Sequence, residues 1–163
     1  LEQMNVTPAS PFIIILSKLI PYWLMGFVVL TIGFFVAWLF YGMTALGSYF
    51  LIYLFAAVFS LAFSGFGLAI SNYAHNFQQA MFIMFFFVIS FIFLSGLYTP
   101  VSSMPEWTQT LSRFSPLRYT VEVLRSVFLK GSTFPDLKYH FLALCGFAVF
   151  FNGWAVLGYR KNR

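Results

Sequence analysis

The stretch from residue 19 to residue 105 is 87 residues long and contains no Asp, Glu, Lys or Arg. One bilayer span needs about 20 apolar residues, so this stretch has room for three transmembrane helices. The whole chain is 61% hydrophobic and only 8% charged, whereas a soluble domain carries about 25% charged residues because its surface faces water. The sequence therefore predicts an all-α, polytopic transmembrane helix bundle without a soluble catalytic domain.

Four apolar runs are predicted to cross the membrane, and they lie at about 20 to 41, 48 to 72, 80 to 98 and 140 to 158. A short helix is expected before the first run, from Pro11 to Lys18. Pro21 is expected to bend or restart that helix, because proline lacks the amide donor. The second run also carries small residues in a row that predicts close helix packing in lipid: Ala56, Ser60, Ser64, Gly65 and Ala69.

The segment between the third and fourth runs, residues 99 to 138, holds most of the charge and is expected to contain two short helices. One begins at Pro105-Glu106, since a carboxylate in the first turn suits the helix dipole. The other begins at Ser115-Pro116 and ends at Gly131, a favourable C-terminal cap. An apolar stripe and a charged stripe on it indicate a helix that lies in the interface or dips partly into the membrane. These stripes are Leu117, Val121, Leu124 and Phe128, and Arg118, Glu122 and Arg125.

The sequence contains no recognisable set of catalytic or metal-binding residues. His75 and His140 are the two histidines, and neither has a partner at metal-ligand spacing. A glycine-rich loop ending in Gly-Lys-Ser or Gly-Lys-Thr is also absent, so the chain is expected to bind no nucleotide, to need no cofactor and to be no enzyme. The basic residues flank the apolar runs, as anchors at lipid headgroups do, which favours membrane lipids over nucleic acid as partners.

The lack of charge within the spans restricts the function further. Proton- and sodium-coupled transporters place carboxylates or histidines at membrane depth, and intramembrane hydrolases need buried nucleophiles, acids or metal ligands. Three classes remain: a permease driven by another subunit, a channel subunit, and a structural membrane protein. Counting basic residues does not fix the orientation, because the two ends together hold four and the segment from 99 to 138 holds five.

Several short motifs resemble those of ABC-2 type transport permeases, in particular their drug-exporter branch. The N-terminal motifs, typical of the segment before that family's third span, are Glu2-Gln3, Val6-Thr7-Pro8, Ser10-Pro11, Ile15-Leu16-Ser17-Lys18-Leu19 and Pro21-Tyr22. The later motifs are Ser95-Gly96, Pro100, Met104-Pro105, Trp107, Pro116-Leu117-Arg118-Tyr119, Leu124-Arg125 and Phe128-Leu129-Lys130-Gly131. Ser115 and Arg118 depart from the family pattern, which often has Asn and Thr at these positions.

The resemblance implies a membrane subunit of an ATP-binding cassette exporter in the bacterial inner membrane. Such a subunit pairs with a second permease copy, as a homodimer or heterodimer, and with an ABC ATPase subunit that hydrolyses the ATP. The resemblance covers the C-terminal half or less of a family member, so an N-terminal part is expected to be missing. It also implies that both ends and the connector from 71 to 79 are cytoplasmic.

On this basis the chain would divide into four parts: a cytoplasmic coupling segment, three transmembrane helices, an extracytoplasmic segment with short re-entrant helices, and a last transmembrane helix with a basic tail. These parts are residues 1–18, 19–98, 99–138 and 139–163. The re-entrant helices would contain Pro105, Trp107, Pro116, Arg118, Glu122 and Arg125.

In the family, the cytoplasmic helix before the third span contacts the ATPase. The resemblance therefore implies coupling roles for Glu2, Gln3, Thr7, Pro8 and Lys18. The alternative is that these residues only cap and anchor an interfacial helix. The apolar, aromatic span faces predict a hydrophobic or amphipathic cargo. The competing hypothesis for the whole chain is a channel-like or structural membrane protein without an ATPase partner.

Overall fold

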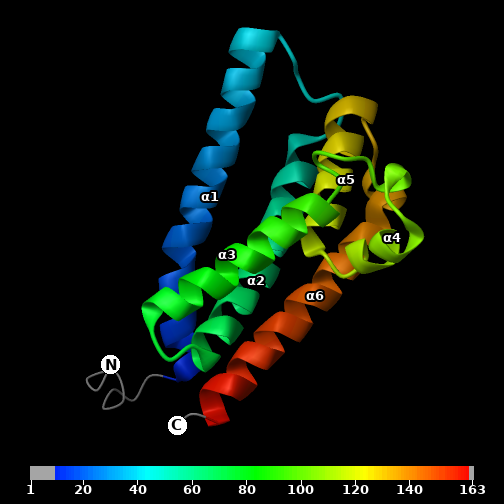
Figure 1. Ribbon diagram of the computed structural model, residues 1–163. Helices are drawn as coiled ribbons and strands as arrows, with labels where there is room; N and C mark the ends of the chain where they lie inside the picture. Colours follow the sequence, from blue (N-terminus) through cyan, green and yellow to red (C-terminus); the bar gives the residue numbers. More distant parts are fainter. Residues whose placement is uncertain (1–9, 162–163) are drawn as a thin grey trace.

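The computed structural model describes residues 10–161, which are helical apart from short connectors. In chain order the elements are α1 (Pro11–Tyr41), α2 (Tyr49–Tyr73), α3 (Phe77–Leu94), the 3-10 helix η2 (Val101–Ser103), α4 (Glu106–Ser112), α5 (Pro116–Lys130) and α6 (Phe134–Lys161) (Figure 1). No strand occurs in this range, and α1, α2, α3 and α6 are long and apolar enough to cross a membrane. The predicted all-α bundle with four spans is confirmed.

The first helix differs from its prediction. A restart at Pro21 is not found, because α1 runs without interruption through this residue from Pro11 to Tyr41. Ending a helix in lipid would leave several backbone groups without partners, whereas an internal proline removes a single donor. The helix ends at Gly42, which has φ of 61°, and the amide of Met43 donates to the carbonyl of Ala37 at 3.2 Å. This left-handed cap favours glycine.

Local capping also shifts the ends of the last two spans. The sixth helix begins at Phe134 rather than near residue 140, because Asp136 Oδ2 accepts hydrogen bonds from both the amide and the hydroxyl of Thr133, at 3.1 and 3.0 Å. This is half of a capping box. The third helix begins at Phe77, where Asn76 Oδ1 accepts from the amide of Gln79 at 2.7 Å, and it ends at Leu94, ahead of a turn at Gly96 with φ of 81°.

The core of the bundle forms where α2 packs parallel to α6 (Figure 1). One buried cluster lies at the end where α5 joins them: Leu51, Ile52, Phe55, Val123, Val127, Leu137 and Leu144. A second cluster lies at the other end of the pair: Ala62, Phe66, Ile70, Ala148 and Phe151. Each cluster combines residues that are far apart in the sequence, and α6 contributes residues to both.

The predicted row of small residues on the second span lies partly in this interface. Gly65 and Ala69 are buried, and a Cβ atom on Gly65 would lie 2.7 Å from Cγ of Asn152. Asn152 in turn donates from Nδ2 to the carbonyl of Leu61 at 3.0 Å. The small residue thus lets a polar side chain of α6 reach the α2 backbone, which is how polar groups hold helices together in lipid.

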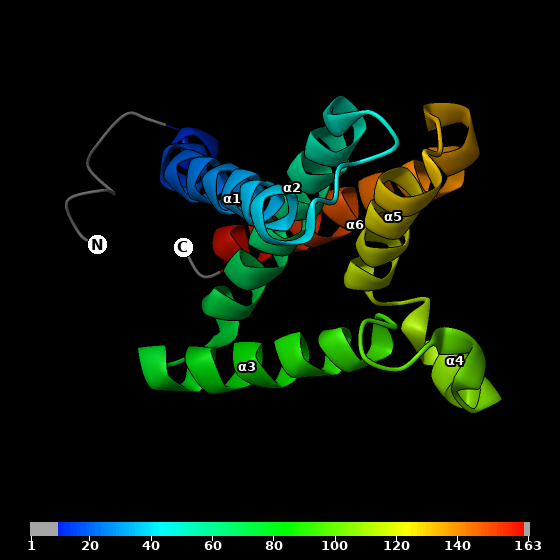
Figure 2. The same cartoon turned by 90° about the horizontal axis from the view of Figure 1, so that it is seen from above.

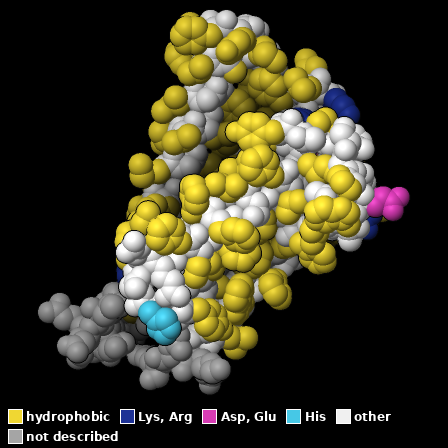
Figure 3. Space-filling view, in the orientation of Figure 1, with side chains coloured by type: hydrophobic (Ala, Val, Ile, Leu, Met, Phe, Trp, Pro, Cys, Tyr) yellow, Lys and Arg dark blue, Asp and Glu magenta, His cyan; other side chains and the backbone are white. Residues whose placement is uncertain are grey.

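The two remaining spans lie at the periphery, α1 and α3 on opposite sides of the central pair (Figure 2). In the described part of α3 no residue is buried, and the apolar window of α1 contains none either. Hydrophobic side chains accordingly cover much of the surface, and a hollow separates α1 from the rest of the bundle (Figure 3). These faces are suited to lipid or to further membrane helices.

Candidate functional site

The amphipathic helix α5 lies in the segment between α3 and α6 and packs against three of the spans, α2, α3 and α6. It begins at Pro116 and ends before Gly131, as its flanking residues predict. Its buried positions are Pro116, Thr120, Val121, Val123 and Val127. The predicted apolar stripe is therefore only partly right. Val123 and Val127 face the α2–α6 core, whereas Leu124 and Phe128 are half-buried, since they point towards the more distant α1.

A charged network joins α4, α5 and α6. Oε1 of Glu122 lies 3.2 Å from Nε of Arg118, one turn earlier on α5. Its second oxygen, Oε2, accepts from Nε2 of His140 on α6 at 2.8 Å. Arg118 also donates from its terminal guanidinium nitrogen to Oγ of the fully buried Ser112 at 2.7 Å and to the carbonyl of Gln109 at 3.4 Å. One carboxylate and one guanidinium thus hold three helices together.

The structure separates the predicted charged stripe into two parts. Arg118 and Glu122 pair with each other, but Arg125 donates to the carbonyls of Gly96 and Leu97 at 3.1 and 3.4 Å. These carbonyls follow the end of α3, where a cation interacts favourably with the exposed carbonyl groups. Ser115, also buried, reaches the carbonyl of Phe91 at 3.4 Å. Helix α5 therefore anchors α3 as well as α6.

The sequence alone does not indicate the part that His140 plays in this network. It is half-buried, its ring packs edge-on against Tyr119 at 6.0 Å, and Nε2 bonds to Glu122. His75, by contrast, lies in the exposed turn between α2 and α3, where its backbone amide donates to Oε1 of Gln79. Within residues 10–161 no group of three or more His, Cys, Asp or Glu side chains is arranged to hold a metal ion.

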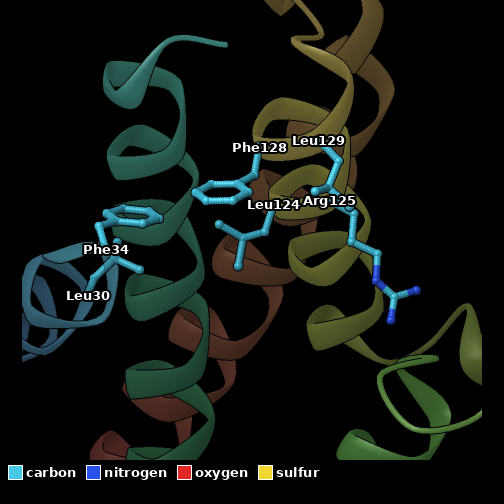
Figure 4. A pocket seen from close by; sticks show the side chains of 6 residues that line it. All are labelled: Leu30, Phe34, Leu124, Arg125, Phe128 and Leu129. Carbon is cyan, nitrogen blue, oxygen red and sulfur yellow. The ribbon is translucent and has the colours of Figure 1, made fainter. Parts of the chain in front are cut away.

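An apolar cavity of about 260 Å³ lies between α1 and α5. Its lining is Leu30, Phe34, Leu124, Arg125, Phe128 and Leu129 (Figure 4). The rings of Phe34 and Phe128 stack across it at 6.0 Å with planes 8° apart. The guanidinium of Arg125 points away from this space, so only its hydrocarbon stem contributes to the wall. The cavity suits a small apolar group and offers no charge to hold an ion.

The other predicted site residues lie apart from this cavity. Pro105 precedes α4, and Trp107 on that helix is exposed. Lys18 is exposed near the N-terminal end of α1. The four remaining coupling residues, Glu2, Gln3, Thr7 and Pro8, lie outside the described residues.

Comparison with known proteins points to the same family as the sequence motifs. The model of the family described as ABC-2 type transporter matches residues 1–129. The probable multidrug ABC transporter permease YbhR of Escherichia coli K12 is 31% identical over 137 residues, which cover 82% of this chain and 36% of that protein. A second relative, the probable multidrug ABC transporter permease YbhS of the same strain, is 31% identical over 154 residues, which cover 94% of this chain and 41% of that protein.

A third relative is the inner membrane transport permease YhhJ of Escherichia coli K12, 27% identical over 165 residues, which cover 99% of this chain and 43% of that protein. No solved structure matches the chain. The chain spans 36 to 43% of the length of these three relatives. With its four apolar helices it is a multi-pass protein of a bacterial inner membrane. It belongs to the ABC-2 type transporter family, and is thus a membrane component of a transporter.

Proposed function

We propose that the chain forms part of the permease subunit of an ATP-driven exporter that moves a hydrophobic or amphipathic substrate. The observation that carries this proposal is the absence of Asp, Glu, Lys and Arg from α2 and α3, within a family of transporters. A transporter without ionisable groups at membrane depth has no relay for a coupling ion. The energy then comes from a separate ABC ATPase subunit.

Helix α1 is suited to transmit the motion of that ATPase. It is 31 residues long, and an uninterrupted helix of this length spans about 46 Å. Few polar contacts hold it to α2: Trp23 Nε1 donates to Ser64 Oγ at 3.0 Å, and Thr31 Oγ1 lies 2.6 Å from Tyr53 Oη. A displacement at its cytoplasmic end would therefore tilt the whole rod, including the part that borders the apolar cavity.

Of the proposed coupling residues, Lys18 lies near the N-terminal end of this rod, and Glu2, Gln3, Thr7 and Pro8 precede the rod in the sequence. ATP binding shifts a conformational equilibrium only through contacts that differ between the two states. Contacts of this segment with the ATPase would provide that difference. The rod would then widen or close the space between Phe34 and Phe128, where an apolar part of the substrate would bind.

The outer elements α4 and α5 would form the fixed side of this gate. The proposed re-entrant residues Pro105, Trp107, Pro116, Arg118, Glu122 and Arg125 belong to them, and the charged network attaches them to α6. In this arrangement residues 99–138 face outwards, and both chain ends and the connector 71–79 are cytoplasmic. The exposed faces of α1 and α3 would contact lipid, further helices of the subunit and a second permease copy.

Cross-linking in the intact permease with its ATPase tests the moving rod. The variant carries Phe34→Cys and Phe128→Cys, with Cys145 and any other cysteine replaced by Ser, and is treated with a bifunctional thiol reagent. The cross-linking yield should differ several-fold between the nucleotide-free and ATP-bound complexes. The control pair Tyr73→Cys and Trp154→Cys joins α2 to α6 across rings 5.9 Å apart and should give one yield in both states.

Equal yields for the Phe34 and Phe128 pair in both states would contradict the moving rod. The competing hypothesis, a channel-like or structural membrane protein, makes a different prediction for the same preparation. No ATPase subunit would then copurify with the permease, and solute flux through reconstituted vesicles would not depend on ATP.

A further inference from the structure

One face of α6 carries an apolar groove that no described helix covers. Its first part is a cavity of about 430 Å³ lined by Arg113, Phe114, Ala143, Gly146, Phe147 and Phe150. Its second part is a cavity of about 460 Å³ lined by Val149, Phe150, Gly153, Trp154 and Leu157. Phe150 lines both cavities, so they adjoin along the helix, and the two together make up the groove.

Two glycines make room along the floor of this groove. Gly146 and Gly153 are seven residues apart, which is two helical turns, so they lie on the same face of α6. A Cβ atom built on either residue would meet nothing within 4 Å. Phe150, 65% exposed, lies between them and forms a wall. The groove therefore has room beside each glycine for a slender apolar chain that passes Phe150.

One end of the groove carries a positive charge. Arg113 follows α4, and its backbone carbonyl accepts a hydrogen bond from Tyr119 Oη at 3.0 Å, which fixes the position of the residue. Its side chain is exposed and makes no ion pair or hydrogen bond with any described residue. An arginine guanidinium binds phosphate through charge-assisted, often bidentate hydrogen bonds. The positive charge of Arg113 beside an apolar groove suits a ligand with an anionic headgroup and an apolar chain.

Helix α3 indicates that Arg113 lies at the depth of lipid headgroups. This span has 18 residues, about 27 Å, which is close to the hydrocarbon thickness of about 30 Å. Ser115, two residues after Arg113, hydrogen-bonds to the carbonyl of Phe91 in the last turn of α3. Arg113 is thus level with the end of the shortest span, where the hydrocarbon layer ends.

The length of the groove matches a single leaflet. From Gly146 to Leu157 the helix rises about 16 Å, and half of the hydrocarbon layer is about 15 Å. We propose that this groove binds an acidic phospholipid of the bilayer, whose phosphate pairs with Arg113 and whose acyl chain lies along Gly146, Phe150 and Gly153. This inference does not depend on the ATPase partner or on the exported substrate.

Native mass spectrometry of the full-length permease tests the site, with phosphatidylglycerol and phosphatidylcholine as the lipid probes. Wild-type protein should retain phosphatidylglycerol in preference to phosphatidylcholine. Arg113→Gln should reduce this preference about tenfold, the loss expected for one charge-assisted hydrogen bond. Arg113→Lys should restore part of it. Gly146→Leu should fill the groove and reduce retention of both lipids.

Matched controls separate this site from general lipid affinity. Lys130→Gln removes an exposed positive charge at the end of α5, and Gly33→Leu fills an equally open position on α1. Neither control should change the preference for phosphatidylglycerol. An unchanged preference in Arg113→Gln would overturn the proposal, as would unchanged lipid retention in Gly146→Leu. Loss of a permease dimer in Gly146→Leu would assign the groove to a second copy and would also overturn it.

Discussion

Glu122 on α5 and His140 on α6 are 18 residues apart in sequence, and their side chains meet at 2.8 Å between Oε2 and Nε2. The other oxygen of the same carboxylate pairs with Arg118, which reaches the buried Ser112 at the end of α4. A single carboxylate therefore connects the two short helices α4 and α5 to the last span. These two helices are attached to the bundle through polar bonds in addition to apolar packing.

Replacing this carboxylate should weaken the attachment of α4 and α5 to α6. Glu122→Ala leaves Arg118 and His140 without their partner, and a hydrogen bond to a charged group contributes roughly 1.5–3 kcal/mol. We expect a loss near the lower end of this range, because the Glu122 side chain is 38% exposed and therefore screened by solvent. The midpoint of thermal unfolding in detergent should fall measurably.

The control for this prediction is Glu106→Ala. Glu106 lies in the first turn of α4, and its side chain is exposed. It makes no ion pair among the described residues, so its removal should affect the unfolding midpoint little. Equal midpoints for the Glu122 and Glu106 variants would mean that the network does not stabilise the fold.

The close contact between α2 and α6 predicts that Gly65→Ala is destabilising. The new Cβ atom would lie 2.7 Å from Asn152 Cγ and 2.8 Å from its backbone nitrogen, so the helices would have to separate. Overpacking of this kind costs roughly 1–3 kcal/mol. Gly67→Ala is the matched control, since its Cβ atom would meet only Met84 Cε, at 3.8 Å. Thermal unfolding of both variants measures the difference, and a Gly65 variant as stable as the Gly67 variant would refute the prediction.

The proposed topology predicts which side of the membrane reacts with thiol reagents. Ser102→Cys and Ser132→Cys, in a background without other cysteines, should react with an impermeant maleimide added to the outside of intact cells. His75→Cys, in the exposed turn between α2 and α3, should react only after the cells are opened. Labelling of the two serine positions only from the cytoplasm would reverse the orientation.

The proposed coupling role predicts that Glu2→Lys in the intact permease weakens ATPase association while membrane insertion stays normal. Like charges placed together at a contact cost several kcal/mol, and about 1.4 kcal/mol already lowers the affinity tenfold. Reconstituted complexes should show less substrate-stimulated ATP hydrolysis at unchanged permease abundance. Asn162→Lys, in the basic tail, should leave hydrolysis unchanged. Normal hydrolysis in the Glu2 variant would instead favour a capping role for this segment.

Local signals predicted the helices of this protein well. The charge-free stretch predicted the three spans that it contains. Pro116 and Gly131 predicted both ends of α5, because capping residues act within one or two turns of the chain. The sequence left open whether Pro21 bends or restarts the first helix, and the structure excludes the restart, because α1 continues through this residue. A proline inside a membrane helix removes a single backbone donor, whereas ending the helix there would leave several backbone groups without partners, so the helix continues.

The sequence by itself determined that this chain is a bundle of membrane helices, since composition and run length alone decide whether a segment is stable in the bilayer. It also carried the motifs of its family. Only the tertiary structure decided that Glu122 pairs with His140, that Arg125 binds the end of α3, and that Arg113 lies at the head of a groove on α6. These relationships depend on how far helices rotate and slide against each other. Packing across helices fixes those quantities, and no local pattern of residues encodes them.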